Sequence, residues 1–403
     1  MQNPMHRAEF IALIAMMFAT IAFSIDSMLP ALPEIAQELS PSEVNRAQLV
    51  LTSFVLGMGI GTLFTGPLSD AFGRKPVILA GAAIYCLAAY LAWSAQGLEM
   101  VLAARLLQGL GAAGPRVVAI AVVRDFYSGR IMARIMSIAM MIFTLVPAFA
   151  PLLGEAIIAF TGWRGIFLAF ILFSVITVLW MGLRLPESLP RENRRPFRAP
   201  LLWAATHEMV THPTVRLSIL VQTFSMGTLF TMLTMVQPIY DEVYGRADSF
   251  PEWFAIVALF AGTASLINAW LVVRVGMRRM VTIALGAQIV LTAAVMGANM
   301  ADLSLDTRFG IFVIWQTSLF FMAGMTLGNL NAIAMEPMGH IAGMAASVIG
   351  AIATFLAAVI AAPVGLTFNG TIWPLAIGVL IMCLCGFAGM IEMGRVERRA
   401  GLR

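Results

Sequence analysis

Charged residues are scarce in this chain of 403 residues: they make up 11% of it, whereas a soluble domain carries roughly 25%. Hydrophobic residues account for 60%. This composition excludes an ordinary soluble domain and predicts an all-α integral membrane protein. Lysine occurs once, at Lys75, against 24 arginines. Because no polybasic tract is present, nucleic-acid binding is not expected.

The sequence also has few residues of the kinds that build catalytic, metal or nucleotide sites. Cys86, Cys383 and Cys385 all lie in apolar runs, where we interpret them as packing residues. In "HEMVTH", from His207, the two histidines are five apart and therefore about 140° apart around a helix, so they cannot chelate one metal. "GMGIG", from Gly57, lies within an apolar run and indicates close helix contact rather than a nucleotide loop. We expect no cofactor, no metal and no enzymatic activity.

Long apolar runs dominate the sequence. A helix that crosses about 30 Å of hydrocarbon needs about 20 apolar residues. Twelve such runs can be drawn, with centres near Ala19, Met58, Ala88, Ala112, Val146, Thr177, Phe230, Phe260, Val290, Phe320, Ile352 and Leu384. The first run follows a short N-terminus without a convincing cleavage site, so we interpret it as an uncleaved membrane helix rather than a signal peptide.

The positions of the basic residues support this count. If the N-terminus is cytoplasmic and each run changes the side, nineteen of the 25 basic residues lie in inner segments. The outer segments hold only Arg46, Arg164, Arg246 and Arg308, and the fourth run contains Arg105 and Arg116. This bias obeys the positive-inside rule and predicts that both termini are cytoplasmic.

A long polar stretch divides the chain in the middle, with six runs before it and six after it. We predict an N-terminal six-helix bundle at 1–184, a cytoplasmic linker at 185–213 with a short surface helix, and a C-terminal six-helix bundle at 214–403. "GRKPVILAGA", from Gly73, resembles "GMRRMVTIAL", from Gly276, at an offset of 203 residues. Because both segments follow the second run of a half, the two halves are expected to be pseudo-symmetric.

A dense group of charged and turn residues, "GPLSDAFGRKP" at 66–76, separates the second and third runs. We expect its two glycines and Pro67 to form the bend, and Asp70 to accept hydrogen bonds from Arg74 or from a neighbouring helix end. Such a charge relay can latch two helices together, whereas a plain topogenic turn needs positive charge but no aspartate. The residues of the predicted latch are Gly66, Asp70, Gly73, Arg74 and Lys75.

Several motifs occur in the order found in one family of transporters. "GPLSDAFGRKPVIL" resembles the characteristic loop of the major facilitator superfamily, in the form of its twelve-helix drug/proton antiporters. "RLLQGLGAAG", from Arg105, is similar to their fourth-helix motif, and "AVVRDFY", from Ala121, continues in the same style. "DSMLPALPEIA", from Asp26, and "MEPMGHIAGMAASVIGA", at 335–351, resemble the Bcr/CflA, or bicyclomycin-resistance, subfamily.

This resemblance implies two six-helix bundles around a central cavity that opens alternately to each side of the membrane. It implies a proton-coupled secondary transporter, acting as a monomer in the bacterial inner membrane, that exports a small amphipathic drug or metabolite. The proton gradient would then replace any cofactor. The alternative is a carrier that imports or exchanges a small organic anion, clamped by Arg105 and Arg116.

Two predicted membrane charges are candidates for proton coupling and substrate binding. A charge at mid-membrane costs at least about 2.5–3.5 kcal/mol, so each one invites a functional explanation. A carboxyl group in a low dielectric binds a proton more readily than one in water, so Asp26 is the candidate proton-binding group. The alternative is that Asp26 is a helix-end carboxylate close to the outer surface, bonded near Ser27. The resemblance gives Arg105 a part in proton coupling. Gln108, one turn later in the same motif, is a candidate for substrate binding. A fixed salt bridge between the first and fourth helices is the alternative for Arg105.

Arg116 departs from the family pattern, because a small or apolar residue is usual at its position. Arg105 and Arg116 are eleven residues apart, almost three turns, and so face the same way. Two cations facing a cavity would favour a substrate with a carboxylate or phosphate group. Pairing with a neighbouring acid, or snorkelling toward the cytoplasmic surface, is the alternative.

The fifth-helix motif also departs from the family pattern. "APLLGE" keeps Pro151 and Gly154 but has Ala150 and Glu155 where glycines are expected, which weakens the case for tight packing of this helix. Glu155 is either a second proton and substrate site or a surface carboxylate that pairs with Arg164.

Overall fold

The computed structural model describes residues 5–399. All regular structure in this range is helical, and no described residue belongs to a β-strand. Within the same range, twelve helical segments are long and apolar enough to cross a membrane. Each contains one of the twelve centres drawn from the sequence, so the predicted number of crossings is confirmed.

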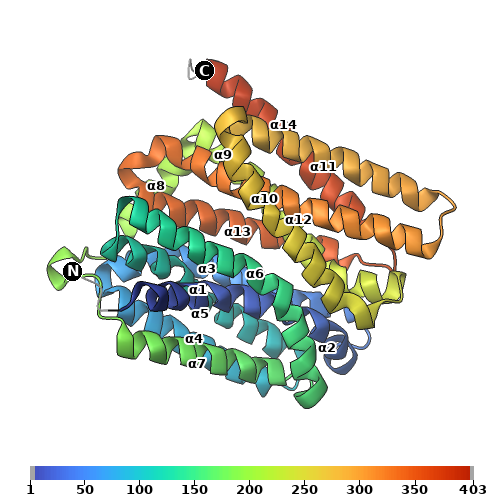
Figure 1. Cartoon of the computed structure of the whole chain (residues 1–403), viewed down its shortest axis with the longest axis horizontal. Helices are drawn as coiled ribbons and strands as arrows, with labels where there is room; N and C mark the ends of the chain where they lie inside the picture. Colours follow the sequence, from blue (N-terminus) through green and yellow to red (C-terminus); the bar gives the residue numbers. More distant parts are fainter. Residues whose placement is uncertain (1–4, 400–403) are drawn as a thin grey trace. The chain divides into compact units, whose positions relative to one another are not determined.

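The chain divides into two compact units, Met1–Ala199 and Pro200–Arg403, with the boundary inside the polar stretch 185–213. The first unit is built from seven α-helices and three short turns of helix (Figure 1). These are α1 (Arg7–Asp26), η1 (Leu29–Ala31), α2 (Leu32–Leu39), η2 (Val44–Gln48), α3 (Leu49–Phe72), α4 (Arg74–Trp93), α5 (Leu98–Phe126), α6 (Gly129–Thr161), α7 (Gly165–Arg184) and η3 (Arg191–Asn193).

Helix α5 is the centre of the first unit. It packs against α3 and α4 and also contacts α1, while α1 packs on α6 and α4 on α7. Glycines allow the closest approaches: a Cβ on Gly57 would lie 1.9 Å from the carbonyl oxygen of Leu106, and one on Gly109 would lie 2.0 Å from that of Phe54. The interpretation of "GMGIG" as a helix-contact motif is therefore confirmed.

The second unit contains the remaining helices (Figure 1). They are α8 (Ala199–Thr211), α9 (Pro213–Pro238), η4 (Ile239–Val243), η5 (Ala247–Ser249), α10 (Phe250–Val275), α11 (Met277–Met300), α12 (Leu305–Met335), η6 (Glu336–Ile341), α13 (Ala342–Leu366) and α14 (Trp373–Arg399). Helix α12 packs against α9, α10 and α11, while α9 packs on α13 and α11 on α14.

The two units repeat one packing pattern. If α1 and α3–α7 are matched in order with α9–α14, the same helix pairs are in contact in both units. The equivalent turns after the second long helix both use a glycine with positive φ, 103° at Gly73 and 86° at Gly276. The expected pseudo-symmetric six-helix bundles are therefore present.

The turn before α4 differs from its prediction. Gly66 and Pro67 lie inside α3, which continues to Phe72, so the expectation that they form the bend is wrong. Only Gly73 leaves the helical conformation. A helix can accommodate an interior proline when packing compensates for the lost hydrogen bond, and α3 packs along α5 over most of its length.

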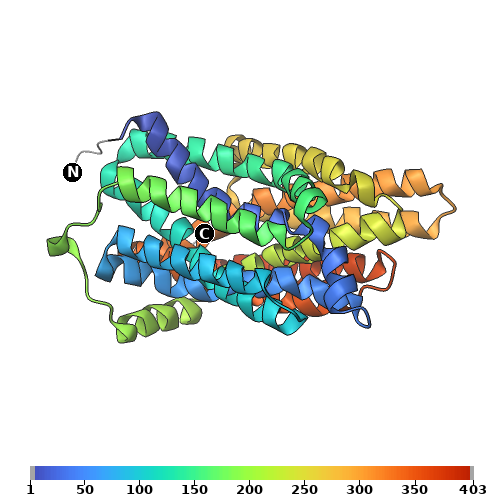
Figure 2. The same ribbon diagram turned by 90° about the horizontal axis from the view of Figure 1, so that it is seen from below.

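The linker has an irregular first part and a helical second part. After α7 it runs as an open loop with the single turn η3, and then enters α8, which covers the predicted surface helix (Figure 2).

Candidate functional site

Asp26 is the last residue of α1, and its side chain is buried, with 5% exposed. Within the described range 5–399, no group forms a hydrogen bond or ion pair with its carboxylate. The neighbouring Ser27 hydroxyl instead donates to the carbonyl oxygen of Phe23, at 2.5 Å. Asp26 is thus a buried carboxyl group at the end of a membrane helix, without the Ser27 bond that the alternative interpretation required.

Arg105 lies on α5 beside the same end of α1 and is fully buried. Its Nε donates to the carbonyl oxygen of Val50 at 3.2 Å, and Nη2 donates to that of Ser24 at 2.9 Å. Nη1 donates to Oε1 of Gln108 at 2.7 Å. The guanidinium therefore joins α1, α3 and α5 without a carboxylate partner, and no fixed salt bridge to Asp26 is formed.

Aromatic and polar side chains enclose this arginine. The Phe54 ring lies 4.4 Å from the guanidinium carbon, a geometry that favours a cation over the ring face. Ser24 and Tyr85 share a hydrogen bond of 2.6 Å between their hydroxyl oxygens, which links α1 to α4. The Nε2 atom of Gln108 is buried without a hydrogen-bond partner in the described part of the chain. Asp26 thus lies two residues from the junction of α1, α3, α4 and α5.

Helix α6 closes against α1 next to Asp26. A Cβ on Gly154 would lie 2.2 Å from the carbonyl oxygen of Ser27, so the two backbones are in close contact. The tight packing that the lost glycines placed in doubt is therefore present at Gly154, one turn after the buried Pro151. Glu155, the next residue, is exposed.

Arg164, the expected partner of Glu155, binds another acid. Its Nη1 donates to Oε1 of Glu38 at 2.6 Å, and the indole Nε1 of Trp163 donates to Oε2 of the same carboxylate at 2.7 Å. This contact joins α2 to the turn between α6 and α7.

Arg116 also lies on α5, but its side chain is exposed. It forms no ion pair with any carboxylate of the residues that the structure describes. The pairing alternative is thus not observed, and neither Arg116 nor Glu155 forms a hydrogen bond or ion pair with Asp26.

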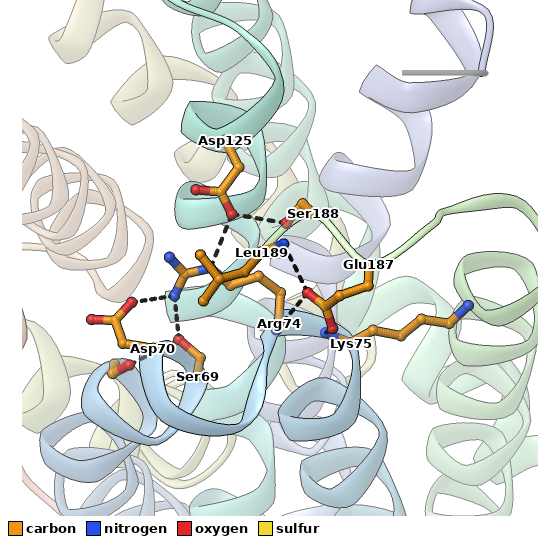
Figure 3. A network of polar contacts seen from close by, with 9 residues as sticks. Ser69, Asp70, Arg74, Lys75, Asp125, Glu187, Ser188 and Leu189 are labelled. Carbon is orange, nitrogen blue, oxygen red and sulfur yellow. Dashed lines mark hydrogen bonds and ion pairs between the residues drawn. The ribbon is translucent and has the colours of Figure 1, made fainter. Parts of the chain in front are cut away.

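The charged group before α4 forms a network around Arg74 (Figure 3). The Arg74 guanidinium donates to Asp70 Oδ1 at 2.5 Å, to Ser69 Oγ at 2.7 Å and, through Nε, to Asp125 Oδ2 at 3.0 Å. Ser188 donates to the same Asp125 oxygen at 2.8 Å. Arg74 thus joins the end of α3, the end of α5 and the linker within one unit.

A linker carboxylate caps α4 in the same network. Glu187 accepts hydrogen bonds from the backbone N–H groups of Arg74 and Lys75, at 2.9 and 3.1 Å, and from that of Leu189 at 3.0 Å (Figure 3). The Lys75 ammonium donates to the carbonyl oxygens of Gly182 and Leu185 at the end of α7. A carboxylate at a helix N-terminus satisfies N–H groups that the helix leaves free and is favoured by the helix dipole.

Sequence reasoning missed several of these residues. Asp125 occurs in the "AVVRDFY" stretch, which could have indicated it, because that stretch continues the fourth-helix motif. Glu187 and Ser188 had no signal beyond their place in a polar linker. Tyr85 and Phe54, around Arg105, lie within ordinary apolar runs and could not be distinguished from packing residues.

The family is decided by comparison with known proteins. The sequence profile of the Major Facilitator Superfamily matches residues 12–362. The chain is a member of the major facilitator superfamily. It is a transporter rather than an enzyme, and a multi-pass membrane protein.

Curated relatives of this superfamily member support its assignment to the Bcr/CflA, or bicyclomycin-resistance, subfamily. It is 33% identical over 282 residues to a bicyclomycin resistance protein homolog of Haemophilus influenzae, covering 69% of this chain and 70% of the relative. It is 28% identical over 364 residues to the multidrug resistance protein MdtL of Escherichia coli, covering 89% and 88%. An uncharacterized MFS-type transporter of Bacillus subtilis, YdgK, is 27% identical over 395 residues, with 96% of each chain covered.

Solved structures show the same fold. A D-xylose-proton symporter matches with a TM-score of 0.73 and 14% identity, covering 95% of this chain and 97% of the symporter. The human organic anion transporter MFSD10 matches with a TM-score of 0.68 and 16% identity, covering 97% and 100%. At these identities the likeness concerns the fold alone.

Proposed function

We propose that this protein exports a small amphipathic compound across the bacterial inner membrane in exchange for protons, by alternating access, with Asp26 as the proton-binding group. The single observation that carries the proposal is the buried Asp26 carboxyl group without a partner in the described part of the chain. The names of the relatives, a bicyclomycin resistance homolog and a multidrug resistance protein, support an exported drug-like substrate.

The physical basis of coupling is the cost of an unpaired buried charge. A carboxylate removed from water without a partner is strongly disfavoured relative to the neutral acid. If Asp26 alternates between a closed and a water-exposed setting, it will bind and release a proton in step with that change. A ligand can shift the balance only by binding one of the two states more tightly than the other.

Arg105 connects the environment of Asp26 to the relative positions of α1, α3 and α5. It holds the carbonyl oxygen of Ser24, two residues before Asp26, and that of Val50 on α3. A movement of the end of α1 relative to α5 must therefore break or re-form a charge-assisted hydrogen bond. The burial of Arg105 and its bonds within its own unit argue against the two-arginine clamp of the anion-carrier alternative.

Everted membrane vesicles test the proposal. Vesicles that contain the protein are acidified inside by respiration, and a pH-sensitive dye reports proton release when members of a panel of neutral, cationic and acidic drug-like compounds are added in turn. We expect release with the wild-type protein and background release with Asp26→Asn, which keeps the side-chain volume but cannot ionise. Glu34→Gln, an exposed acid on α2, is the matched control and should behave like the wild type. Transport by Asp26→Asn at the full rate and with an unchanged pH dependence would refute the role of Asp26.

A further inference from the structure

Arg116 is an arginine in the middle of a membrane helix, and no residue of the range 5–399 forms a hydrogen bond or ion pair with it. It lies nine residues before Asp125, whose carboxylate binds Arg74 at the cytoplasmic end of α5. At 1.5 Å per residue, Arg116 is about 13 Å from that level along the helix axis. A charge at such a depth is costly unless it is paired or serves a function.

The orientation of Arg116 on α5 differs from that of the residues exposed near the start of the same helix. At 100° per residue, Arg116 lies only about 20° around the helix from Arg105, but about 140–160° from the exposed Ala103 and Met100. On the Arg105 side, α5 is covered by the backbones of α1 and α3, whose carbonyl groups bind Arg105. Arg105 is fully buried on this side of α5, whereas Arg116, on the same side almost three turns later, is exposed.

The two ordinary explanations do not fit this position. No carboxylate among residues 5–399 forms an ion pair with Arg116. Snorkelling would require the guanidinium to reach the level of Asp125, about 13 Å along the axis, which is about twice the reach of an arginine side chain. Arg124, in the last turn of α5, is the exposed arginine close to that level.

The surroundings on α5 leave the guanidinium open to a ligand. Ala112 and Ala119, one turn before and one turn after Arg116, are both fully buried and carry only methyl groups. Ile120, the bulky residue one turn after Arg116 on this face, is itself 40% exposed, so this face of α5 is open over that turn. A planar guanidinium with several N–H donors binds carboxylate and phosphate oxygens through paired hydrogen bonds.

We propose that Arg116 binds an oxyanion group of the transported compound, so that the substrates are amphipathic acids or zwitterions rather than neutral or purely cationic drugs. This inference rests on the proposed transport function and specifies its substrate class. Arg105 is not the second half of the site, because its own unit encloses it and uses its donors. Arg116 alone recognises the acid group of the compound. It places no requirement on the apolar part of the compound.

Matched ligands separate recognition of the acid from recognition of the apolar body. The probes are a panel of aromatic acids, each paired with its own primary amide, beginning with 1-naphthaleneacetic acid and 1-naphthaleneacetamide. Dissociation constants are obtained at pH 7 from ligand-dependent thermal unfolding of the full-length protein in detergent. Since a hydrogen bond to a charged group contributes about 1.5–3 kcal/mol, we expect the preferred acids to bind about 10- to 100-fold more tightly than their amides.

Variants on the same helix assign the preference to Arg116. Arg116→Gln should abolish the preference for acids, whereas Arg116→Lys should retain part of it. Arg124→Gln removes the same charge near the end of the same helix and should leave the preference intact. The midpoint without ligand reports whether each variant is folded, and the conservative lysine variant keeps the comparison decisive if the glutamine variant unfolds.

Two results would overturn the proposal: no acid of the panel binding more tightly than its amide, or an unchanged preference in Arg116→Gln. Because binding is measured without a pH gradient, failure of proton exchange in the vesicle assay would leave the outcome unaffected. Loss of acid recognition and loss of proton coupling are therefore separate results.

Discussion

Gly154 determines how closely α6 can approach the end of α1 beside Asp26. A Cβ there would lie 2.2 Å from the Ser27 carbonyl oxygen, so Gly154→Ala must push the two helices apart. Overpacking of this kind costs about 1–3 kcal/mol. We expect a lower thermal midpoint in detergent and slower drug-dependent proton release in everted vesicles.

Gly182→Ala is the matched control, because no heavy atom lies within 4 Å of a Cβ at that position in α7. Replacing an unhindered glycine within a helix by alanine stabilises the helix by about 0.5–1 kcal/mol. The two variants should therefore shift the midpoint in opposite directions. A midpoint for Gly154→Ala at or above the wild-type value would show that α1 and α6 separate without cost.

At individual positions, the sequence identified charges more reliably than their partners. Asp26, Arg105 and Arg116 were singled out because charge is rare in apolar runs. The bonds of Arg105 to two backbone carbonyl groups could not be predicted, because every residue has a carbonyl group and only the packing of α1 and α3 determines which ones are near.

At the scale of helices, the N-terminus of α4 depends on a residue from the linker. Glu187 accepts three backbone hydrogen bonds, two of them from the first residues of α4. In Glu187→Gln one oxygen is replaced by an NH2 group that faces N–H donors, so we expect a loss of about 0.5–2 kcal/mol, as for other helix caps. The thermal midpoint should fall, whereas Glu192→Gln, an exposed acid in η3, should leave it unchanged. Equal midpoints for the two variants would contradict a capping role.

The repeated turns at Gly73 and Gly276 provide a second comparison between helices. Both have positive φ, so alanine at either position is strained by about 1–3 kcal/mol. A Cβ on Gly73 would also lie 2.7 Å from Glu187 Oε2 and 2.8 Å from Arg194 Nη2, whereas one on Gly276 meets no atom within 4 Å. Gly73→Ala should therefore lower the thermal midpoint more than Gly276→Ala. If the two midpoints fell equally, the side chains around Gly73 would be free to move aside.

The helices themselves were largely predictable, because a membrane helix is a local property of about 20 apolar residues. Their ends were less so. Gly66 and Pro67 are turn residues by composition, but α3 continues through them, since packing along α5 outweighs local preference. Glu187 caps α4 across more than a hundred residues of sequence, and no local pattern announces such a contact.

For the whole molecule, the distribution of basic residues predicts the side of every loop. The linker around Glu192 is rich in arginine, whereas the turn between α11 and α12, at Asp302, contains none. Arginine and lysine are retained in the cytoplasm during insertion, so we expect the linker inside and the α11–α12 turn outside.

Single cysteines report the two sides directly. All three native cysteines are unpaired, so they can be replaced by alanine or serine before Glu192→Cys or Asp302→Cys is introduced. A membrane-impermeant maleimide should label Asp302→Cys in intact spheroplasts and Glu192→Cys only in everted vesicles. The reverse pattern would place both termini outside. Labelling of both positions from the same side would contradict an odd number of crossings between them. The expected pattern requires an odd number of crossings between these positions. The structure has three, which are α9, α10 and α11, because α8 with 13 residues is too short to cross.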